Sequence, residues 1–332
     1  MDVQIKLNDV DISSYVLSYT RDKSICDGVG IADVELNSLF PTTVVPYDEI
    51  KIYESSVHKG TYFVSSQSKT IPAGSLTLNC QDSSKLLADY FISDQYDIGD
   101  DLEVRASDII KKYLDEVGVS YSFTTYVGDS YVAKYSVFGL TYANEVVTAM
   151  CQQCGWFFKF DADNTCIFGS FALGTGAASI DAGDMTSVNN QKDDAMARNM
   201  VKVWGADDLQ YTVDESGVWQ RDSNDDRAIV LSNGWIDTEA LAQTLSTQLL
   251  TEYNKITDKY EIELIGAYNL DIGDTLTYSS SYFSGDGIIT ALEAIMSKDG
   301  LLTRVTLGQR CPRQYAYYGC LLYTSPSPRD RS

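Results

Sequence analysis

The first 81 residues alternate apolar and polar side chains in short runs that are separated by turn signals. Residues 3–7 show the period of two that is typical of a half-buried strand, and Asn8-Asp9 then predicts a turn. Similar runs follow at residues 10–12, 50–53, 61–64 and 76–80. Several short strands at this spacing predict a small barrel or sandwich.

The middle of the chain changes to a helical period. Ser107 is a predicted N-cap for a helix with an apolar stripe, and Gly118 lies where a left-handed C-cap is expected. A second helix is predicted from Tyr142 to Cys154. The residues after it, 156–168, predict a β-hairpin with its turn at 161–164.

The last third returns mainly to a β pattern. Residues 169–190 are rich in Gly, Ala and Ser and predict a linker or surface loop. A third helix is predicted after Thr238, because apolar residues repeat there every four positions. Strands are predicted on both sides of this helix, at residues 201–205, 260–264, 275–278, 287–289 and 302–307.

These patterns predict an α+β, mainly β fold in which two small β-barrel-like domains flank a middle α+β domain. We expect the first barrel and its exit helix at 1–95, the middle domain at 96–190, and the second barrel with one helix at 191–312. A length of 332 residues agrees with two or three domains. The first and last thirds are candidates for similar barrels.

Charge and composition exclude several classes of protein. The formal net charge of −22 argues against a nucleic-acid surface, which needs clustered Lys and Arg. It also disfavours an anionic membrane surface. No apolar run reaches the length of about 18 residues that a membrane span needs. The first residues show no basic and apolar signal pattern, so we expect no secretory signal.

Cysteine and histidine limit the available chemistry. Seven scattered cysteines do not form a disulfide framework, and His58 is the single histidine, in a predicted hairpin loop. A zinc site with several histidines is therefore impossible within one chain. Cys151 and Cys154 form a C-x-x-C at the end of the predicted second helix, where buried free thiols are a better interpretation than a redox pair.

Other candidate motifs have simpler structural explanations. Paired carboxylates would serve a glycoside hydrolase only across a cleft, and solvated loops explain them equally well. The turn at 161–164 lacks the glycine and distal glutamate of a calcium loop. The isolated G-x-G triplets complete no nucleotide-binding motif, and Gly128-Asp129-Ser130 is no nucleophile elbow. We therefore predict no catalytic, metal or cofactor-binding residues. The carboxylate pairs are Asp100-Asp101, Asp207-Asp208 and Asp225-Asp226, and the triplets begin at Gly28, Gly174 and Gly285.

The C-terminal tail, residues 313–332, needs a separate explanation. Residues 320–332 resemble a translated sequencing adapter, so we interpret them as an artefact and exclude them from the fold. On this interpretation the natural chain is free to continue beyond Gly319.

Three stretches resemble the phage baseplate or tail hub family, which includes late control protein D and tail-associated hub-like proteins. The first is the opening VQIKLNDVDISSYVLSYT with IKIYE and LTLNCQDSSKLLADYFI. The second is ASDIIKKYLDEVGVSYSF with NEVVTAMCQQCGWFFKFDADNTCIF. The third is NMVKVWG with NLDIGDTLTYSSSYFSGDGIITALEAIMSKDGLLTRVTLGQ. Together they cover about residues 1–310.

This resemblance implies a non-enzymatic structural protein of a phage or prophage virion, made in the host bacterial cytoplasm. Such hubs are homotrimers in which each chain contributes two similar barrels to a six-barrel ring. The implied partners are the tail tube or distal tail protein on one side and a spike, fibre or lysin on the other. Two alternatives remain open: a peptidoglycan- or polysaccharide-active tail enzyme, and a carbohydrate-binding β module that uses its tyrosines.

Overall fold

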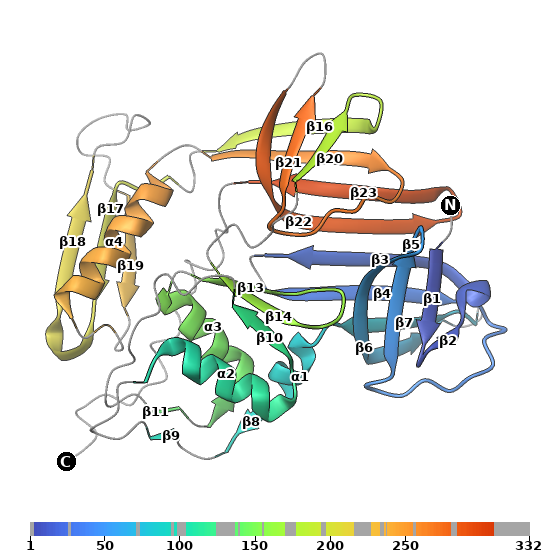
Figure 1. Cartoon of the computed structure of the whole chain (residues 1–332), viewed down its shortest axis with the longest axis horizontal. Coiled ribbons are helices and arrows are strands. Elements are labelled where there is room, and N and C mark those ends of the chain that lie inside the picture. The colour runs from blue at the N-terminus through green and yellow to red at the C-terminus, as the bar shows by residue number, and fades with distance from the viewer. Residues whose placement is uncertain are drawn as a thin grey trace.

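The computed structural model describes residues 3–25, 28–70, 74–93, 96–97, 104–123, 137–138, 140–154, 156–169, 177–193, 197–215, 227–232, 236, 238–254, 257–279 and 284–308. Within them the chain is mainly β: two barrel-like β parts lie next to each other, and an α+β part formed by the middle of the chain lies beside them (Figure 1). This confirms the predicted fold class. The tail at 313–332, with its adapter-like end, lies outside the described residues.

The first barrel is built from the N-terminal strands. Their hydrogen-bonded order is β3-β4-β7-β6-β5-β1-β2, and apolar side chains on alternate positions form one core around Ile5, Val34 and Ile52. A 3-10 turn, η1 (Ser13–Tyr15), leads into β3. The strands are β1 (Val3–Leu7), β2 (Val10–Asp11), β3 (Val16–Ser24), β4 (Val29–Leu36), β5 (Glu49–Glu54), β6 (Val57–Lys69) and β7 (Leu76–Gln81).

The middle part packs three helices beside a sheet of order β10-β14-β13. The predicted hairpin is confirmed, because β13 pairs antiparallel with β14. The elements are α1 (Ser84–Asp89), β8 (Phe91–Ile92), β9 (Tyr96–Asp97), α2 (Ala106–Val117), β10 (Tyr121–Phe123), β11 (Val137–Phe138), β12 (Thr141–Tyr142), α3 (Ala143–Cys154), β13 (Phe157–Phe160) and β14 (Cys166–Gly169).

The ends of α2 were predicted with mixed success. Gly118 has the expected left-handed conformation, with φ of 74°, and its N–H closes the helix on Asp115 and Leu114. The predicted N-cap is wrong: Arg105 is the capping residue, and Ser107 lies buried inside the first turn. A serine in the first turn has the same local sequence signature as a serine at the cap. The sequence alone therefore misplaces the start of the helix by one or two residues.

The second barrel contains strands from two separate stretches of chain. Its order is β15-β21-β22-β23-β20-β16. The predicted linker at 169–190 is wrong for residues 177–181 and 185–190, which are strands, because backbone pairing to β21 and β20 needs few apolar side chains. The strands are β15 (Ala177–Asp181), β16 (Met185–Asp193), β20 (Thr257–Ile265), β21 (Thr275–Ser279), β22 (Ser284–Ser297) and β23 (Gly300–Leu307).

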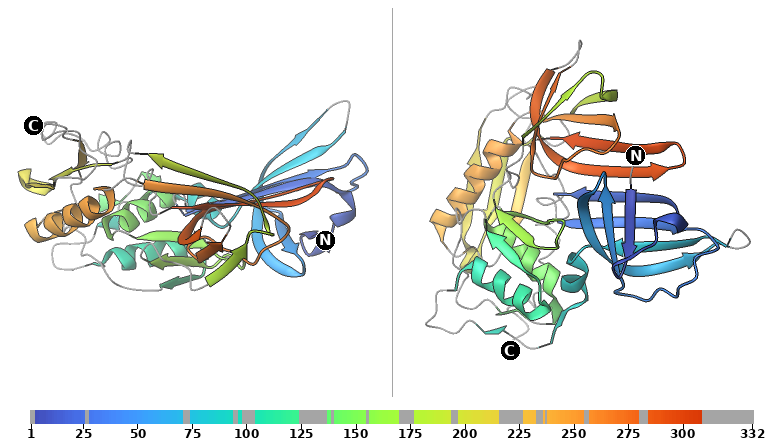
Figure 2. Two further views of the ribbon diagram at one scale, coloured as in Figure 1. Left: turned by 90° about the horizontal axis from the view of Figure 1, so that it is seen from above. Right: turned by 45° about the vertical axis from the view of Figure 1, so that its right-hand side comes forward.

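A small α/β unit is inserted between β16 and β20. Its strands β17 (Met200–Trp204), β18 (Gln210–Asp214) and β19 (Ala228–Ser232) form their own sheet, with η2 (Ala206–Asp208) between β17 and β18. The predicted third helix is α4 (Glu239–Tyr253), capped by Thr238, and it packs on this sheet with a separate core. Figure 2 shows the unit beside the middle part and apart from the first barrel. The domain boundaries predicted at 95, 190 and 312 stay predictions.

The two barrels are joined by strand pairing. Six residues of β3, Tyr19 to Ser24, pair antiparallel with β22 from Met296 to Ala291. The sheets of both barrels therefore run into one continuous sheet, of order β16-β20-β23-β22-β3-β4-β7-β6-β5-β1-β2 (Figure 1). The first half of β22 pairs with β21, and its second half pairs on the same side with β3.

The barrels repeat one strand plan. The order β3-β4-β7-β6-β5 in the first corresponds to β16-β20-β23-β22-β21 in the second, with the strands met in the same chain order. Register shifts fall at matching places, between Val16 and Ser18 in β3, Met185 and Ser187 in β16, Val64 and Ser66 in β6, and Ile289 and Ala291 in β22. The repeat differs in its last strand: β1 is antiparallel to β5, whereas β15 is parallel to β21.

Candidate functional site at the barrel junction

Strand β3 carries the side chains that make the junction unusual. The period of two in a strand turns Tyr19, Arg21 and Lys23 toward the interior and Thr20 and Asp22 toward the outer face of the sheet. Arg21 and Lys23 are only 2% and 4% exposed. Charged side chains are rarely buried to this degree unless they are paired or hydrogen-bonded, so each must find partners inside.

Arg21 finds its partner across the interior of the first barrel. Its Nη2 lies 3.2 Å from Oε1 of Glu54 on β5, and the Tyr19 hydroxyl donates to the same oxygen at 2.8 Å. Glu54 is 1% exposed. Burial and the nearby Glu54 charge raise the pKa of Tyr19, so this hydroxyl stays a donor. The pair fixes the interior face of β3 against β5.

Two buried lysines tie the barrels to the middle part. Lys23 Nζ donates to the carbonyl oxygen of Phe160 at 3.2 Å. Lys159, on β13, donates to Oδ2 of Asp271 at 2.8 Å and to the carbonyl of Ile272 at 2.7 Å. Burial raises the pKa of Asp271, but the charges of Lys23 and Lys159 outweigh it and lower that pKa overall. The carboxylate is therefore held ionised between the two ammonium groups.

A third buried lysine ties the first barrel to the second. Lys59, on β6, donates to the carbonyl of Tyr268 at 2.8 Å and to Oδ1 of Asn269 at 3.3 Å. Burial lowers its pKa and also that of Lys23. The loop between β20 and β21 is thus held from both the first barrel and the middle part.

Asp82 follows β7 and connects the start of β4 to the start of α1 by hydrogen bonds. Its Oδ2 accepts the Gly30 N–H at 2.5 Å and its Oδ1 accepts the Ser84 N–H at 3.0 Å. A β-carbon at position 30 would lie 2.7 Å from that Oδ2, so the approach requires glycine. Burial raises the pKa of Asp82 to about 6, against the opposing effect of these hydrogen bonds and of the Lys23 charge.

The G-x-G triplet at 28–30 therefore has a structural role. Gly28 has φ of 62°, and a β-carbon there would lie 2.6 Å from the ring of Phe158 on β13. The middle part thus packs directly onto the β3–β4 turn. The Gly285 triplet lies in β22, and the Gly174 triplet and Gly128-Asp129-Ser130 lie outside the described residues.

His58 positions a turn. Its Nδ1 lies 3.2 Å from Oδ1 of Asp163, its Nε2 lies 3.1 Å from the Thr61 hydroxyl, and its ring stacks on Tyr53 at 4.9 Å between centroids. These contacts hold the β13–β14 turn against β6. Within that turn, Asp161 accepts from the backbone of residues 163 and 165, so its carboxylate is used locally.

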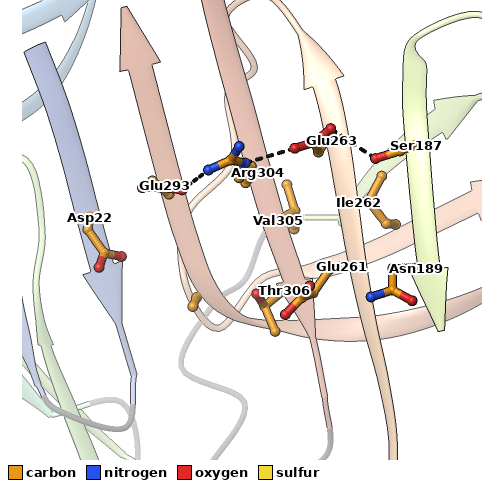
Figure 3. Close-up of a pocket in the computed structure, with 11 residues that line it drawn as sticks. Asp22, Ser187, Asn189, Glu261, Ile262, Glu263, Glu293, Arg304, Val305 and Thr306 are labelled. Carbon is orange, nitrogen blue, oxygen red and sulfur yellow. Dashed lines mark hydrogen bonds and ion pairs between the residues drawn. The ribbon is translucent and has the colours of Figure 1, made fainter. Parts of the chain in front are cut away.

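The outer face of the joined sheet is polar and acidic. Arg304 of β23 donates from Nε to Glu263 at 2.8 Å and from Nη1 to Glu293 at 3.1 Å, and Ser187 donates to Glu263 at 2.9 Å (Figure 3). This row of polar side chains continues across the junction to Asp22, whose backbone lies opposite Glu293 in the β3–β22 register. A hollow of about 500 Å³ lies along this face. Hydrogen bonds from Arg304 and Ser187 lower the pKa of Glu263, so it stays ionised.

The remaining sequence candidates do not come together. Cys151 is buried, and nothing is described for the side chain of Cys154. Burial raises the pKa of Cys80 to about 12 and also raises that of Cys166, which keeps both as thiols. Asp207-Asp208 forms part of η2, and the other two carboxylate pairs lie outside the described residues.

Within the described ranges, no three His, Cys, Asp or Glu side chains gather to hold a metal ion. None of the helices described is long and apolar enough to cross a membrane.

Sequence reasoning missed the buried charge cluster. Its members lie on β3, β5, β6, β13 and the β20–β21 loop, so no short motif connects them. One signal was present: Arg21 and Lys23 occupy the inward positions of an alternating strand, where an apolar residue is the usual choice.

Removal of Glu54 should be far more costly than removal of an exposed partner. Glu54→Ala leaves Arg21 buried and unpaired, and we expect the free energy of unfolding to fall by about 3–5 kcal/mol. Glu263→Ala, on the outer face, should cost less than about 1 kcal/mol. Urea unfolding followed by circular dichroism measures both. The double variant Arg21→Met/Glu54→Leu should recover most of the loss, and equal losses for Glu54→Ala and Glu263→Ala would contradict this difference between buried and exposed partners.

Asp82 should make the protein more stable as the pH falls. Its folded pKa, about 6, lies above its unfolded value of 3.8, so the folded state binds the proton more tightly. Between pH 7 and pH 4.5 this group should add about 2 kcal/mol to the free energy of unfolding. The difference between wild type and Asp82→Asn should change by that amount across the interval.

Asp11→Asn is the matched control for this pH experiment. Hydrogen bonds from Gln4 and Ser13 lower the pKa of Asp11 to about 2, so it does not titrate in the same interval. The difference between wild type and Asp11→Asn should stay constant from pH 7 to pH 4.5. If the effect of Asp82→Asn does not depend on pH, the pKa of Asp82 in the folded protein is not raised.

Comparison with known proteins identifies the architecture. No family model matches the sequence, and no curated protein matches it. Among solved structures, the chain is similar to the 43 kDa tail protein of prophage MuSo2 from Shewanella oneidensis, with a TM-score of 0.70 and 12% identity over 95% of this chain and 99% of that one. It is similar to the tail protein from Neisseria meningitidis MC58, with a TM-score of 0.72 and 13% identity over 94% and 98%.

The likeness extends to a secretion protein. The E. coli c3393 protein is a component of the type VI secretion system with structural similarity to the T4 bacteriophage tail proteins gp27 and gp5. It matches with a TM-score of 0.54 and 10% identity, over 92% of this chain and 76% of that chain. The two barrels, the middle part and the junction between them thus form the fold of the prophage tail proteins, which is the fold implied by the resemblance to tail hubs.

Proposed function

We propose that this chain is a structural component of a phage or prophage tail: a hub at the baseplate or tail tip that connects the tail tube to the spike or fibre. The observation that carries this proposal is the match to prophage tail proteins over nearly the whole of both chains. The fold alone is shared at this identity, so the function is inferred from the match together with the junction.

The junction supports a mechanical role. A hub must transmit force between partners without changing the angle between its domains. Here the barrels share one sheet, and three buried lysines tie β3, β6 and β13 to other parts of the chain. Buried lysines with defined acceptors favour one geometry, because any other arrangement leaves a buried charge without a hydrogen-bond partner.

The enzymatic alternative has less support. A glycosidase needs two carboxyl groups across a cleft, one of them with a raised pKa. Among the described carboxyl groups, Asp82 has a raised pKa, but both of its oxygens accept backbone N–H groups in the interior. On the open face, the pKa of Glu263 is lowered by its hydrogen bonds from Arg304 and Ser187, which is the opposite of what a general acid needs.

The proposed assembly is a homotrimer within the virion, made in the host bacterial cytoplasm. Its partners are the tail tube or distal tail protein on one side and a spike, fibre or lysin on the other. The acidic face of the sheet favours partners of complementary charge.

The solution mass of the full chain tests this proposal. Light scattering at several concentrations should give three times the subunit mass of 36.7 kDa. A strict monomer at every concentration would contradict the trimeric hub. Release of soluble products from peptidoglycan or polysaccharide by the purified chain would favour the enzymatic alternative, whereas we expect none.

A further inference from the structure

The interior of the junction holds more positive than negative side chains, although the chain as a whole carries a net charge of −22. Among the described residues, four cations are buried there, against two buried carboxylates and the partly buried Asp271. A buried charge is costly unless an opposite charge or hydrogen bonds compensate it, so this excess needs a physical explanation. The cations are Arg21, Lys23, Lys59 and Lys159, and the carboxylates are Glu54 and Asp82.

Lys59 is the site of the excess. In the described part of the chain its ammonium group has no carboxylate partner and donates to two neutral oxygens, the carbonyl of Tyr268 and Oδ1 of Asn269. Arg21, by contrast, forms an ion pair with Glu54. An ammonium group has three N–H donors, so one N–H of Lys59 has no acceptor among the residues described. One positive charge and one donor are therefore left uncompensated at this lysine.

Two further buried donors lack an acceptor. The Nε–H of Arg21 and the hydroxyl of Tyr62 have no hydrogen-bond partner within the described ranges, and both side chains are at most 2% exposed. Burial raises the pKa of Tyr62 against the opposing effect of the Arg21 charge, so the hydroxyl keeps its proton and stays a donor. A buried donor without an acceptor costs free energy, and each one in a folded protein calls for an explanation.

The strand register gathers these donors at one end of the first barrel. Gly60 pairs with the residue of β5 that lies two positions before Glu54 on the same inward face. The ring of Tyr62 packs over Gly60, because a β-carbon there would lie 2.7 Å from the Tyr62 hydroxyl oxygen. Arg21 reaches the same end of β5 through its contact with Glu54 at 3.2 Å. Burial lowers the pKa of Lys59, and the charges of Glu54 and Arg21 also act on it, as expected for neighbours.

A small anion satisfies these three donors better than water does. A water molecule accepts two hydrogen bonds and brings two protons that need acceptors of their own. A halide ion accepts from every donor around it, and its single charge balances the uncompensated ammonium of Lys59. The negative charge of Glu54 is already offset by Arg21, and its Oε1 accepts from Arg21 and Tyr19. The donor set therefore fits a monovalent anion.

We propose that the junction contains an internal binding site for a small monovalent anion of the halide class. Its donors are the Nε–H of Arg21, the hydroxyl of Tyr62 and the ammonium group of Lys59. The bound ion holds β3 against β6 and, through Lys59, against the β20–β21 loop of the second barrel. This site belongs to the folded chain alone and does not depend on the hub function or on assembly.

The dependence of stability on chloride tests the site in the full chain. Urea unfolding is followed by circular dichroism while sodium chloride replaces sodium gluconate at constant total salt, which keeps the ionic strength fixed. When one ion binds the folded state alone, the equilibrium constant for unfolding falls about tenfold for each tenfold rise in chloride above the dissociation constant. Sodium bromide should give the same dependence.

Two variants connect the chloride effect to this site. Tyr62→Phe removes one donor and keeps the ring, so the chloride dependence should move to concentrations about tenfold higher or more. In gluconate this variant should be no less stable than the wild type, because an unpaired hydroxyl is removed. Lys59→Met removes the uncompensated charge and should abolish the dependence. The matched control is Tyr113→Phe, equally buried in α2, which should leave the dependence unchanged.

Crystals of the full chain grown in sodium bromide locate the ion directly. An anomalous-scattering peak in contact with Arg21 Nε and the Tyr62 hydroxyl supports the site, whereas a water molecule there without bromide would overturn it. Equal stability in chloride and gluconate would also overturn it. A chloride dependence that Tyr62→Phe and Lys59→Met leave unchanged would do the same, because the ion then binds elsewhere. A monomeric chain that keeps the expected chloride dependence would contradict the hub assembly and support this site.

Discussion

The pairing of β3 with β22 is the contact on which the rest of the structure depends. It joins the sheets of the two barrels into one continuous sheet, and the inward face of β3 carries the buried Arg21 and Lys23. Those charges then determine what surrounds them: Glu54 from β5, and the carbonyl of Phe160 from the middle part. A few strand pairs therefore commit four distant stretches of chain to one arrangement.

Polar groups are distributed differently on the two faces of this sheet. Inside, each buried cation has a defined acceptor, and removal of that acceptor is costly because it leaves a desolvated charge without a partner. Outside, Arg304 is shared between Glu263 and Glu293 in contact with water, where such pairs contribute little to stability. The interior charges hold the barrels together, and the exterior charges leave the sheet face free to meet other molecules.

Local patterns in the sequence predicted local structure well. The apolar stripe and Gly118 placed α2, Thr238 placed α4, and the turn at 161–164 placed the β13–β14 hairpin. Each depends on contacts within about one turn or one hairpin. The strands β15 and β16 were missed because their partners, β21 and β20, lie far along the chain and their own side chains are mostly small or polar. The buried charges were missed for the same reason, since Lys59 and Tyr268 meet only in the folded chain.

The connection that follows β3 in the first barrel differs greatly in length from the one that follows its counterpart, β16, in the second. In the first barrel β3 passes to β4 through a short turn, whereas in the second the α4 unit lies between β16 and β20. The register of the flanking strands is nevertheless the same. The barrel thus accepts a whole folded unit at this hairpin without rearranging its sheet. The connection between β16 and β20 is therefore a place where a chain with this fold carries an additional attachment while the framework beneath it is preserved.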